Sequence, residues 1–152
     1  MRIVSGGQTG ADRAAFDAAL ALGIPIGGWV PQGRLDEDGT IPARYPSLRE
    51  VDSPEPSVRT ERNVRDSDAT LVLSHGELSG GSALTAELCE RLEKPSLHLD
   101  LALSSCNGAA QLTDWLTRIQ PDVLNVAGAR HSEDPRLYAA AYALFLDVLE
   151  AA

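Results

Sequence analysis

Hydrophobic and polar positions along the chain form short apolar runs that alternate with stretches of helical periodicity. The apolar runs, which predict buried strands, lie at residues 2–5, 24–30, 68–74, 96–101 and 122–126. The helical patterns lie at residues 11–22, 81–92, 109–119 and 135–149. Strands that alternate with helices are typical of βαβ units and a parallel sheet. We therefore expect an α/β fold: a Rossmann-like, open, doubly wound sheet of about five mainly parallel strands with helices on both faces.

Residues 31–57 break this alternation. They hold five of the nine prolines and several acidic residues, and they show no convincing period. A loop of this length inside a compact domain is usually functional or disordered. Because it begins directly after the second predicted strand, we expect a lid or binding loop at the ligand-binding edge; a passive surface insertion is the alternative. Residues 60–65 then predict one or two helical turns, with Arg59, Arg62 and Arg65 spaced by three on one face.

Length and charge narrow the class of protein. The 152 residues favour a single Rossmann-like domain spanning 1–152, and the net charge is −9. A nucleic-acid binder usually carries a basic patch, so we expect no nucleic-acid partner. No apolar run reaches the roughly 18 residues of a membrane span, and no signal peptide is evident, so we also expect no membrane partner.

The two cysteines, Cys89 and Cys106, do not form a pair with metal-ligand spacing. This argues against a zinc site and against a disulfide scaffold, and we expect no bound metal ion. A reduced, cytoplasmic location is the natural interpretation.

A glycine-rich turn from Ser5 to Arg13 follows the first strand and opens the first helix. Glycines allow a ligand to approach the backbone closely, and a helix start offers free N–H groups and a positive dipole end. The turn is neither a Walker A motif nor GxGxxG, which argues against a nicotinamide dehydrogenase. An ordinary βα turn is the alternative to a phosphate cradle. The candidate ligand contacts here are Ser5, Gly6, Gly7, Gln8, Thr9, Gly10 and Arg13.

A second glycine-containing turn, at residues 79–87, follows the clearest predicted strand and opens a helix, so it could bind an anion in the same way. Two helix starts at strand ends are stronger evidence for anion binding than either one alone. Glu87 follows a turn or more into the helix, where its carboxylate either lies below the pocket or is a solvated surface charge. The candidate contacts here are Ser79, Gly80, Gly81, Ser82 and Thr85.

Further candidates come from the last strand and the loop. Asn125, Gly128 and Arg130 follow or end the last strand, where Arg130 could pair with a phosphate; a plain surface turn is the alternative. Trp29 could stack on a flat heterocycle or belong to the core. Arg34 either lies near the mouth of the pocket or is a solvated loop charge.

The three histidines do not form a recognisable constellation. His98 falls in a predicted strand, and His75 and His131 are loop residues with no obvious acidic partner in the sequence. Local sequence gives no Ser-His-Asp site and no GxSxG elbow. The absence of a nucleophile–base pair favours binding over catalysis.

Six segments in order along the chain resemble the molybdenum (molybdenum-cofactor) carrier family. They are SGGQTGADR (5–13), GWVPQGR (28–34), IPARYP (41–46), RTERNVRDSDATL (59–71), LSGGSALT (78–85) and LNVAG (124–128). The resemblance covers essentially the whole chain. It implies a Rossmann-like domain related to the lysine-decarboxylase-like phosphoribohydrolases of the Lonely Guy type.

The resemblance also implies a function. Relatives bind and protect the molybdenum cofactor, a pterin with one terminal phosphate and a dithiolene-held molybdenum, and they are oligomeric; molybdoenzymes would be the recipients. Lonely Guy enzymes use a Gly-Gly-x-Gly-Thr-x-x-Glu loop, and residues 80–87 keep the spacing to Glu87 but replace the inner Gly-Thr pair. We therefore expect a carrier for a phosphorylated flat heterocycle. The alternatives are a nucleoside-monophosphate phosphoribohydrolase with Glu87 as its catalytic residue, or a nucleotide-sensing module.

Overall fold

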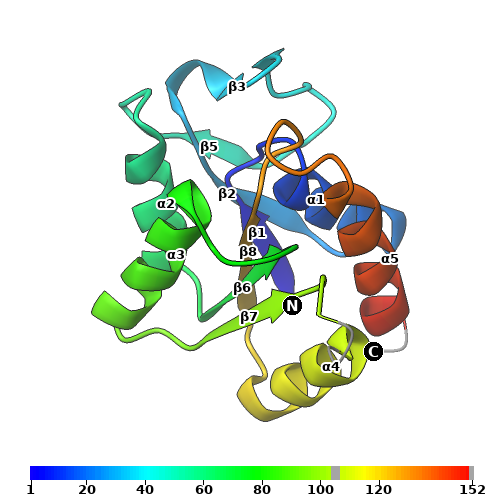
Figure 1. The fold of residues 1–152 in the computed structure, drawn as a ribbon. Coiled ribbons are helices and arrows are strands. Elements are labelled where there is room, and N and C mark those ends of the chain that lie inside the picture. Colours follow the sequence, from blue (N-terminus) through cyan, green and yellow to red (C-terminus); the bar gives the residue numbers. More distant parts are fainter. Residues whose placement is uncertain (104–106, 151–152) are drawn as a thin grey trace.

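A computed structural model describes residues 1–103 and 107–150, and these residues form a six-stranded, wholly parallel sheet (Figure 1). The sheet order is β5-β2-β1-β8-β6-β7. The strands are β1 (Arg2–Ser5), β2 (Ile26–Val30), β5 (Leu48–Glu50), β6 (Ala69–Ser74), β7 (Ser96–Asp100) and β8 (Val123–Gly128). The expected Rossmann-like, doubly wound α/β fold is confirmed, with one strand more than the sequence predicted.

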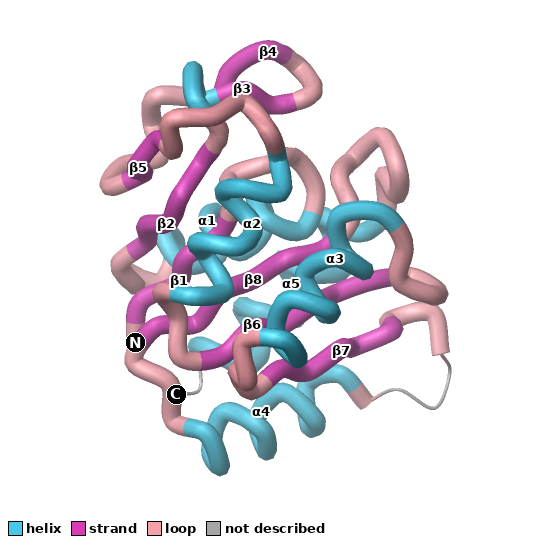
Figure 2. Tube along the Cα trace, turned by 90° about the vertical axis from the view of Figure 1, so that its left-hand side faces the viewer, coloured by secondary structure: helices cyan, strands magenta, loops and turns pink. Residues whose placement is uncertain are grey.

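Helices cover both faces of this sheet (Figures 1 and 2). On one face, α2 (Pro56–Arg65) packs against α3 (Gly80–Arg91). On the other, α1 (Ala11–Ala21) packs against α5 (Leu137–Glu150), and α4 (Gly108–Ile119) lies beside α5. Five of the six alanines of α1 are fully buried, and small side chains let this helix approach the sheet closely.

The last strand, β8, lies in the middle of the sheet, between β1 and β6. Asn125 is buried at the centre of β8, and its Nδ2 donates to Thr70 Oγ1 of β6 at 3.2 Å. On the other side, Ser5 Oγ of β1 donates to the carbonyl oxygen of Val126 at 2.7 Å. A Cβ at Gly128 would lie 2.5 Å from Ala11 Cβ, so only glycine lets the end of β8 meet the start of α1. These contacts hold the carboxyl ends of β1, β8 and β6 next to one another.

The segment 31–57 is more regular than the sequence suggested. It contains a 3-10 turn (Gln32–Arg34), the two-stranded hairpin β3 (Leu35–Asp36) and β4 (Gly39–Thr40), and the edge strand β5. The helix α2 begins at Pro56, four residues before the predicted start at residue 60. Elements of two or three residues are too short to show a hydrophobic period, which is why the sequence pattern missed them.

The hairpin rests on the glycine-rich turn between β1 and α1. Arg13 Nη2 donates to Asp36 Oδ2 at 2.9 Å, and Gln8 Nε2 donates to the carbonyl oxygen of Leu35 at 3.0 Å. Glu37 accepts a hydrogen bond from the hydroxyl of Thr9. Gln8, Thr9 and Arg13, which the sequence predicted as ligand contacts, therefore hold this hairpin in place.

Two sequence expectations concern features away from the sheet. Cys89 is a buried free thiol beside Val64 and Leu88, and Cys106 lies outside the described residues. Within residues 1–103 and 107–150, no helix is both long and apolar enough to cross a membrane.

Candidate ligand-binding site

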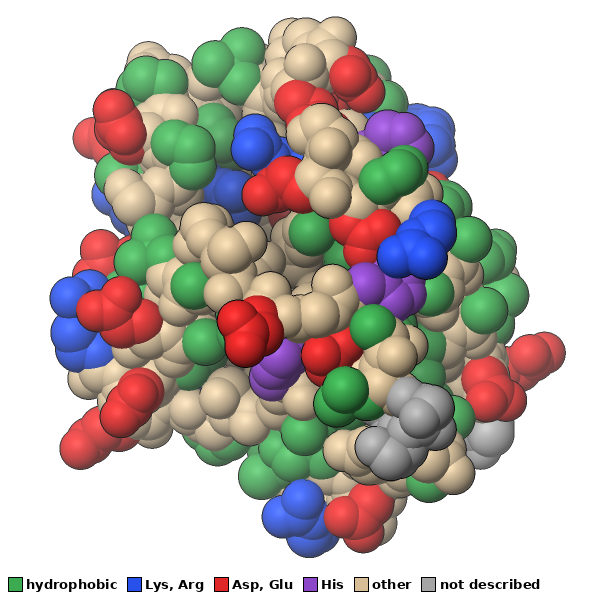
Figure 3. Space-filling model, in the orientation of Figure 1, with side chains coloured by type: hydrophobic (Ala, Val, Ile, Leu, Met, Phe, Trp, Pro, Cys, Tyr) green, Lys and Arg blue, Asp and Glu red, His purple; other side chains and the backbone are tan. Residues whose placement is uncertain are grey.

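A cavity of about 250 Å³ lies beyond the carboxyl ends of the central strands, where ligands bind in open α/β sheets. Figure 3 shows this face hollowed near its centre, with basic and acidic side chains gathered along the rim. The residues that line the cavity are Gln8, Asp12, Pro56, Arg59, Thr60, Gly80, Gly81, Ser82, Thr85, Ala127, Gly128, Arg130 and Glu133.

The start of α3 forms one wall of the cavity. Ser79 precedes it in extended conformation, and no side chain of residues 1–103 or 107–150 caps the helix. By contrast, Asn107 caps α4 by accepting from the amide of Ala110 at 3.1 Å. An uncapped helix start presents unpaired N–H groups and the positive end of the helix dipole. This wall is therefore electropositive without any charged side chain.

Arg59 enters the cavity from α2. Its guanidinium Nη1 lies 3.9 Å from Asp12 Oδ2, and the two side chains are only 16% and 5% exposed. Arg59 Nε is buried and has no hydrogen-bond partner in the part of the chain that the structure describes. A buried N–H without an acceptor is costly, so this donor is suited to an anionic ligand.

Gly6 makes room for this arginine. A Cβ at position 6 would lie 2.2 Å from Arg59 Nη1, which is closer than any real contact. The glycine-rich turn therefore does contribute to the site, but by letting a cation from another helix lie across it.

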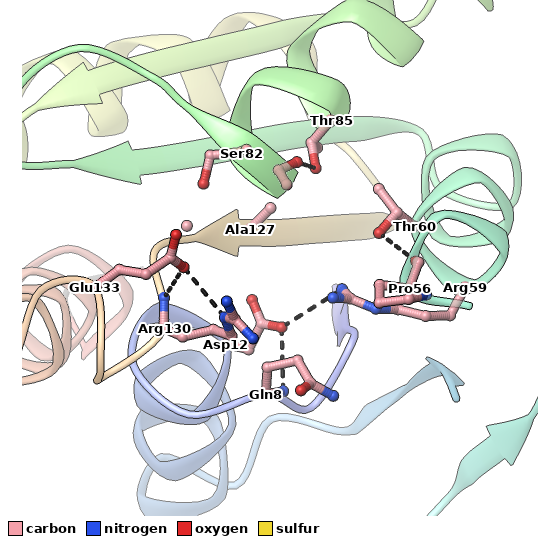
Figure 4. Close-up of a pocket in the computed structure, with 13 residues that line it drawn as sticks. Gln8, Asp12, Pro56, Arg59, Thr60, Ser82, Thr85, Ala127, Arg130 and Glu133 are labelled. Carbon is pink, nitrogen blue, oxygen red and sulfur yellow. Dashed lines mark hydrogen bonds and ion pairs between the residues drawn. The ribbon is translucent and has the colours of Figure 1, made fainter. Parts of the chain in front are cut away.

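Asp12 contributes a carboxylate to the side opposite α3. Figure 4 shows Gln8 and Asp12 on one side of the cavity and Ser82 and Thr85 on the other. Burial raises the pKa of Asp12, and the guanidinium of Arg59 opposes that shift. The carboxylate also accepts from the backbone N–H of Gln8 at 3.2 Å. Asp12 thus balances Arg59 and caps the turn before α1.

Arg130 and Glu133 form the rim on the β8–α5 loop. Glu133 Oε1 accepts from both the backbone N–H and the Nε of Arg130, at 3.1 and 3.2 Å. Both side chains are partly exposed. A cation beside an anion at the mouth makes the rim nearly neutral, so the attraction for an anion comes mainly from the α3 start and Arg59.

Seven of the predicted contacts line this cavity. They are Gln8, Gly80, Gly81, Ser82, Thr85, Gly128 and Arg130. The structure thus brings together residues from the two predicted helix starts and from the last strand. This was the main geometric expectation of the sequence.

Other predicted contacts lie outside the cavity lining. Ser5 and Asn125 are buried in the sheet, where they bridge neighbouring strands. Thr9 and Arg13 are held by the hairpin carboxylates. Gly6, Gly7 and Gly10 shape the turn, and Ser79 lines a smaller neighbouring recess.

Trp29 lies away from the cavity. Its Nε1 donates to Asp66 at 2.9 Å, and the guanidinium groups of Arg49 and Arg62 lie over its ring, 4.6 and 5.1 Å from the ring centre. Arg34 donates to the carbonyl oxygen of Pro42 at 2.9 Å and so holds its own loop. Neither side chain is positioned to contact a ligand in this cavity.

The groups proposed for a hydrolase are also elsewhere. Glu87 is exposed on α3 and does not line the cavity. Arg62 and Arg65 pair with Asp52 and Asp66. Although Arg59, Arg62 and Arg65 are spaced by three along α2, only Arg59 among them lines the cavity.

Sequence reasoning missed several lining residues. They are Asp12, Pro56, Arg59, Thr60, Ala127 and Glu133. Asp12 was inside the quoted turn, and Arg59 was noted only for its spacing. A helix start placed at Pro56 would have put Arg59 in the first turn, at the same sheet edge as the glycine-rich turn.

The parallel sheet defines a Rossmann-like protein, and the cavity at its carboxyl edge combines an uncapped helix start with a buried arginine. Residues 3–149 match the circularly permutated YpsA SLOG family, and the chain belongs to that family. A solved structure described as "Putative molybdenum carrier protein", from Syntrophus aciditrophicus SB, is 49% identical, with a TM-score of 0.93 over 97% of this chain and 94% of that one. No functionally curated protein matches the chain.

The sheet order agrees with the family's description. If β8 were moved ahead of β1, the strands would read 4-3-2-1-5-6 across the sheet, which is a regular outward winding from the first strand. Met1 and Leu149 line the same surface hollow, so the two ends of the fold lie close together. The position of β8 is therefore what a circular permutation would produce.

Proposed function

We propose that this protein binds and carries a phosphorylated flat heterocycle, and that the ligand is the molybdenum cofactor. The observation that carries the proposal is the uncapped start of α3 in one cavity with the unpartnered, buried Nε of Arg59. Both features are suited to a phosphate group. The 49% identity to a protein named as a molybdenum carrier favours this cofactor among phosphorylated ligands.

The residues present fit the phosphate end of such a cofactor. Amide groups at Gly81 and Ser82, the hydroxyl of Ser82 and the guanidinium of Arg59 would hold the phosphate oxygens. The volume of about 250 Å³ is below that of most enclosed small-molecule sites, so the cavity would enclose the phosphate and leave part of the ring at the open rim.

The metal would not be held by protein side chains of the described part of the chain. Among residues 1–103 and 107–150, no cluster of three His, Cys, Asp or Glu side chains is arranged to hold a metal ion. In the proposed complex the pterin's own dithiolene sulfurs hold the molybdenum. The protein's part is then to bind the phosphate, orient the ring and leave the metal end available for transfer.

A nucleotide-sensing module is the second candidate, because a nucleoside monophosphate offers the same phosphate to the same helix start. The hydrolase alternative is weaker, because Glu87 is exposed and outside the cavity. A thermal-shift screen with nucleotides and pterins separates the candidates, since a ligand that binds only the folded state raises its stability.

The direct test is expression in a host that makes the molybdenum cofactor, followed by measurement of co-purified molybdenum and of the fluorescent oxidised pterin. Ser82→Glu places a carboxylate in the third position of α3, where the helix dipole tolerates it but a phosphate is repelled. Ala110→Glu adds the same charge at the third position of α4, away from the cavity, and is the matched control.

We expect cofactor with the wild-type protein and with Ala110→Glu, and none with Ser82→Glu. If stoichiometric cofactor mixed with the pure wild-type protein is not retained, the carrier proposal is wrong. If nucleotides stabilise the protein and pterins do not, the nucleotide-sensing function replaces it.

A further inference from the structure

A smaller recess of about 100 Å³ adjoins the main cavity. Ser82 and Glu133 line both spaces, so the start of α3 lies between them. His75 and Asp134 also line the recess. Figure 3 shows histidine and acidic side chains beside the hollow on this face.

His75 and Asp134 form a fixed pair in this recess. His75 Nδ1 lies 2.6 Å from Asp134 Oδ2, and the side chains are 15% and 13% exposed. Asp134 is itself held, because its Oδ1 accepts from the backbone N–H of Arg136 at 3.1 Å. A carboxylate on Nδ1 assigns the proton to that nitrogen and fixes the plane of the ring. Two loops that are 59 positions apart are joined by this bond.

The second ring nitrogen of His75 is available. Nε2 has no hydrogen-bond partner among residues 1–103 and 107–150. Because Nδ1 holds a proton for Asp134, Nε2 can accept a proton from water and then donate it to an anion. The adjacent helix start is where the proposed function places the ligand's phosphate.

The charged surroundings of His75 come from three elements. Glu77 lies on the same β6–α3 loop, and Glu133 and Asp134 come from the β8–α5 loop. Asp100 ends β7 and accepts from the backbone N–H of Gly76 at 2.7 Å. That amide is the main cause of the lowered pKa of Asp100, and nearby His98 and His75 lower it further.

His98 is the other titratable neighbour. Its Nε2 lies 2.7 Å from Ser74 Oγ, on the exposed edge strand β7, and His98 does not line the recess. It therefore serves as a comparison for His75 rather than as part of the site.

We propose that His75, positioned by Asp134, is a proton-bearing contact for a dianionic phosphomonoester bound at the start of α3. On binding, one proton moves from the solvent to His75 Nε2, and the resulting imidazolium donates to a phosphate oxygen; no covalent bond to the ligand forms or breaks. The ligand's dianion then lies between the imidazolium and the guanidinium of Arg59. This inference rests on the proposed function, because it uses the same anion site.

The test uses inorganic sulfate as the probe. Sulfate stays dianionic at neutral pH, whereas a phosphate ester itself titrates near pH 6, so any proton taken up with sulfate goes to the protein. Isothermal titration calorimetry in buffers of different ionisation heat counts these protons. Titrations at about pH 6 and about pH 8 bracket the ordinary range of histidine.

At the higher pH, we expect about one proton to be taken up for each sulfate bound. We expect sulfate to bind about tenfold more tightly at the lower pH, the change that results when binding takes up one proton over one pH unit. His75→Gln should remove the proton uptake and the pH dependence. His98→Gln should keep both. Asp134→Asn, which keeps the shape but removes the charge, should weaken both and serves as the second variant if His75→Gln does not fold.

Two outcomes overturn different claims. Sulfate binding without proton uptake, or with uptake that survives His75→Gln, overturns the role of His75 and leaves the anion site intact. Sulfate that binds at neither pH, or binds unchanged to Ser82→Glu, overturns the anion site, and the role of His75 with it.

Discussion

Arg59 and Asp12 form a buried ion pair that links α2 to the first turn of α1 at the wall of the ligand cavity. Their nearest charged atoms, Arg59 Nη1 and Asp12 Oδ2, are 3.9 Å apart. Burial lowers the pKa of Arg59 and raises that of Asp12, and each charge opposes the shift of the other. Because the pair is loose, the guanidinium keeps donor capacity for a ligand while the carboxylate holds it in place.

Arg59→Ala should lower the free energy of unfolding at pH 7 by about 3 kcal/mol, because it leaves the Asp12 carboxylate buried without a partner. The pKa of Asp12 is already raised in the folded state and would rise further in this variant. Because the folded pKa lies above the ordinary 3.8, the cost of the buried charge is absent below that value and is complete once the pH has risen through the folded pKa. The loss in Arg59→Ala should therefore shrink as the pH falls from 7 to about 4.

Urea denaturation at the two pH values measures this effect. Adding Asp12→Asn to Arg59→Ala should restore part of the stability at pH 7, because no buried charge then remains. A single Arg59→Ala variant as stable as the wild type at pH 7 would show that the pair is not structural.

Gly6→Ala should weaken sulfate binding by about tenfold, the effect of losing one charge-assisted contact. The new methyl group would lie 2.2 Å from Arg59 Nη1 and push the guanidinium aside. Calorimetric titration measures the loss. In an Arg59→Ala background the same substitution should have no further effect on binding; an equal loss there would place the cause in the turn itself.

Glu133→Gln should strengthen sulfate binding severalfold at low salt. Glu133 lines both the cavity and the recess, and without its carboxylate the positive charge of Arg130 at the rim is no longer compensated. The gain should fall as ionic strength rises, because salt screens exposed charges. Titration at two salt concentrations checks this, with Glu90→Gln on the exposed face of α3 as the control. Unchanged affinity for Glu133→Gln would show that the charge at the rim does not act on the bound anion.

Glu37→Gln should loosen the hairpin β3–β4. Glu37 accepts from the hydroxyls of Ser132 and Thr9, and these bonds, that from Ser132 first, are the main cause of its pKa falling below the ordinary 4.5. Its contribution to stability is therefore present above pH 4.5 and lost as pH falls through its folded pKa. We expect a melting temperature about 2 °C lower at neutral pH and no difference in acid, measured by differential scanning calorimetry. Equal melting temperatures at neutral pH would contradict this role.

The sequence predicted the parts of the fold that depend on local pattern. The glycine-rich turns after strands predicted the starts of α1 and α3, and the alternation of strands with helices predicted the parallel sheet. Each of these signals lies within about ten residues of sequence. The pattern did not reveal β5, whose three residues pair with β2. Without β5 the start of α2 was misplaced, and with it the position of Arg59.

Residues of the candidate site could be predicted from the sequence only where a single local motif contained them. Arg13 looked free in the sequence because its partner, Asp36, is 23 positions away in a hairpin with no periodic signal. His75 looked isolated for the same reason, because Asp134 approaches only when β8 inserts beside β6. Pairings across such distances depend on the order of the strands in the sheet, and no local sequence pattern determines that order.

The central position of β8 also affects how the protein must be made. A ribosome completes β1, β2 and β5, then β6 and β7, before it adds the strand that joins them. Until residues 123–128 are made, β1 and β6 each lack the strand that pairs with them in the complete sheet, so both keep an unpaired edge. Such edges are templates for wrong pairing. The sheet can therefore be completed only by the strand that comes last of the six in chain order, because that strand is the one that joins its two halves.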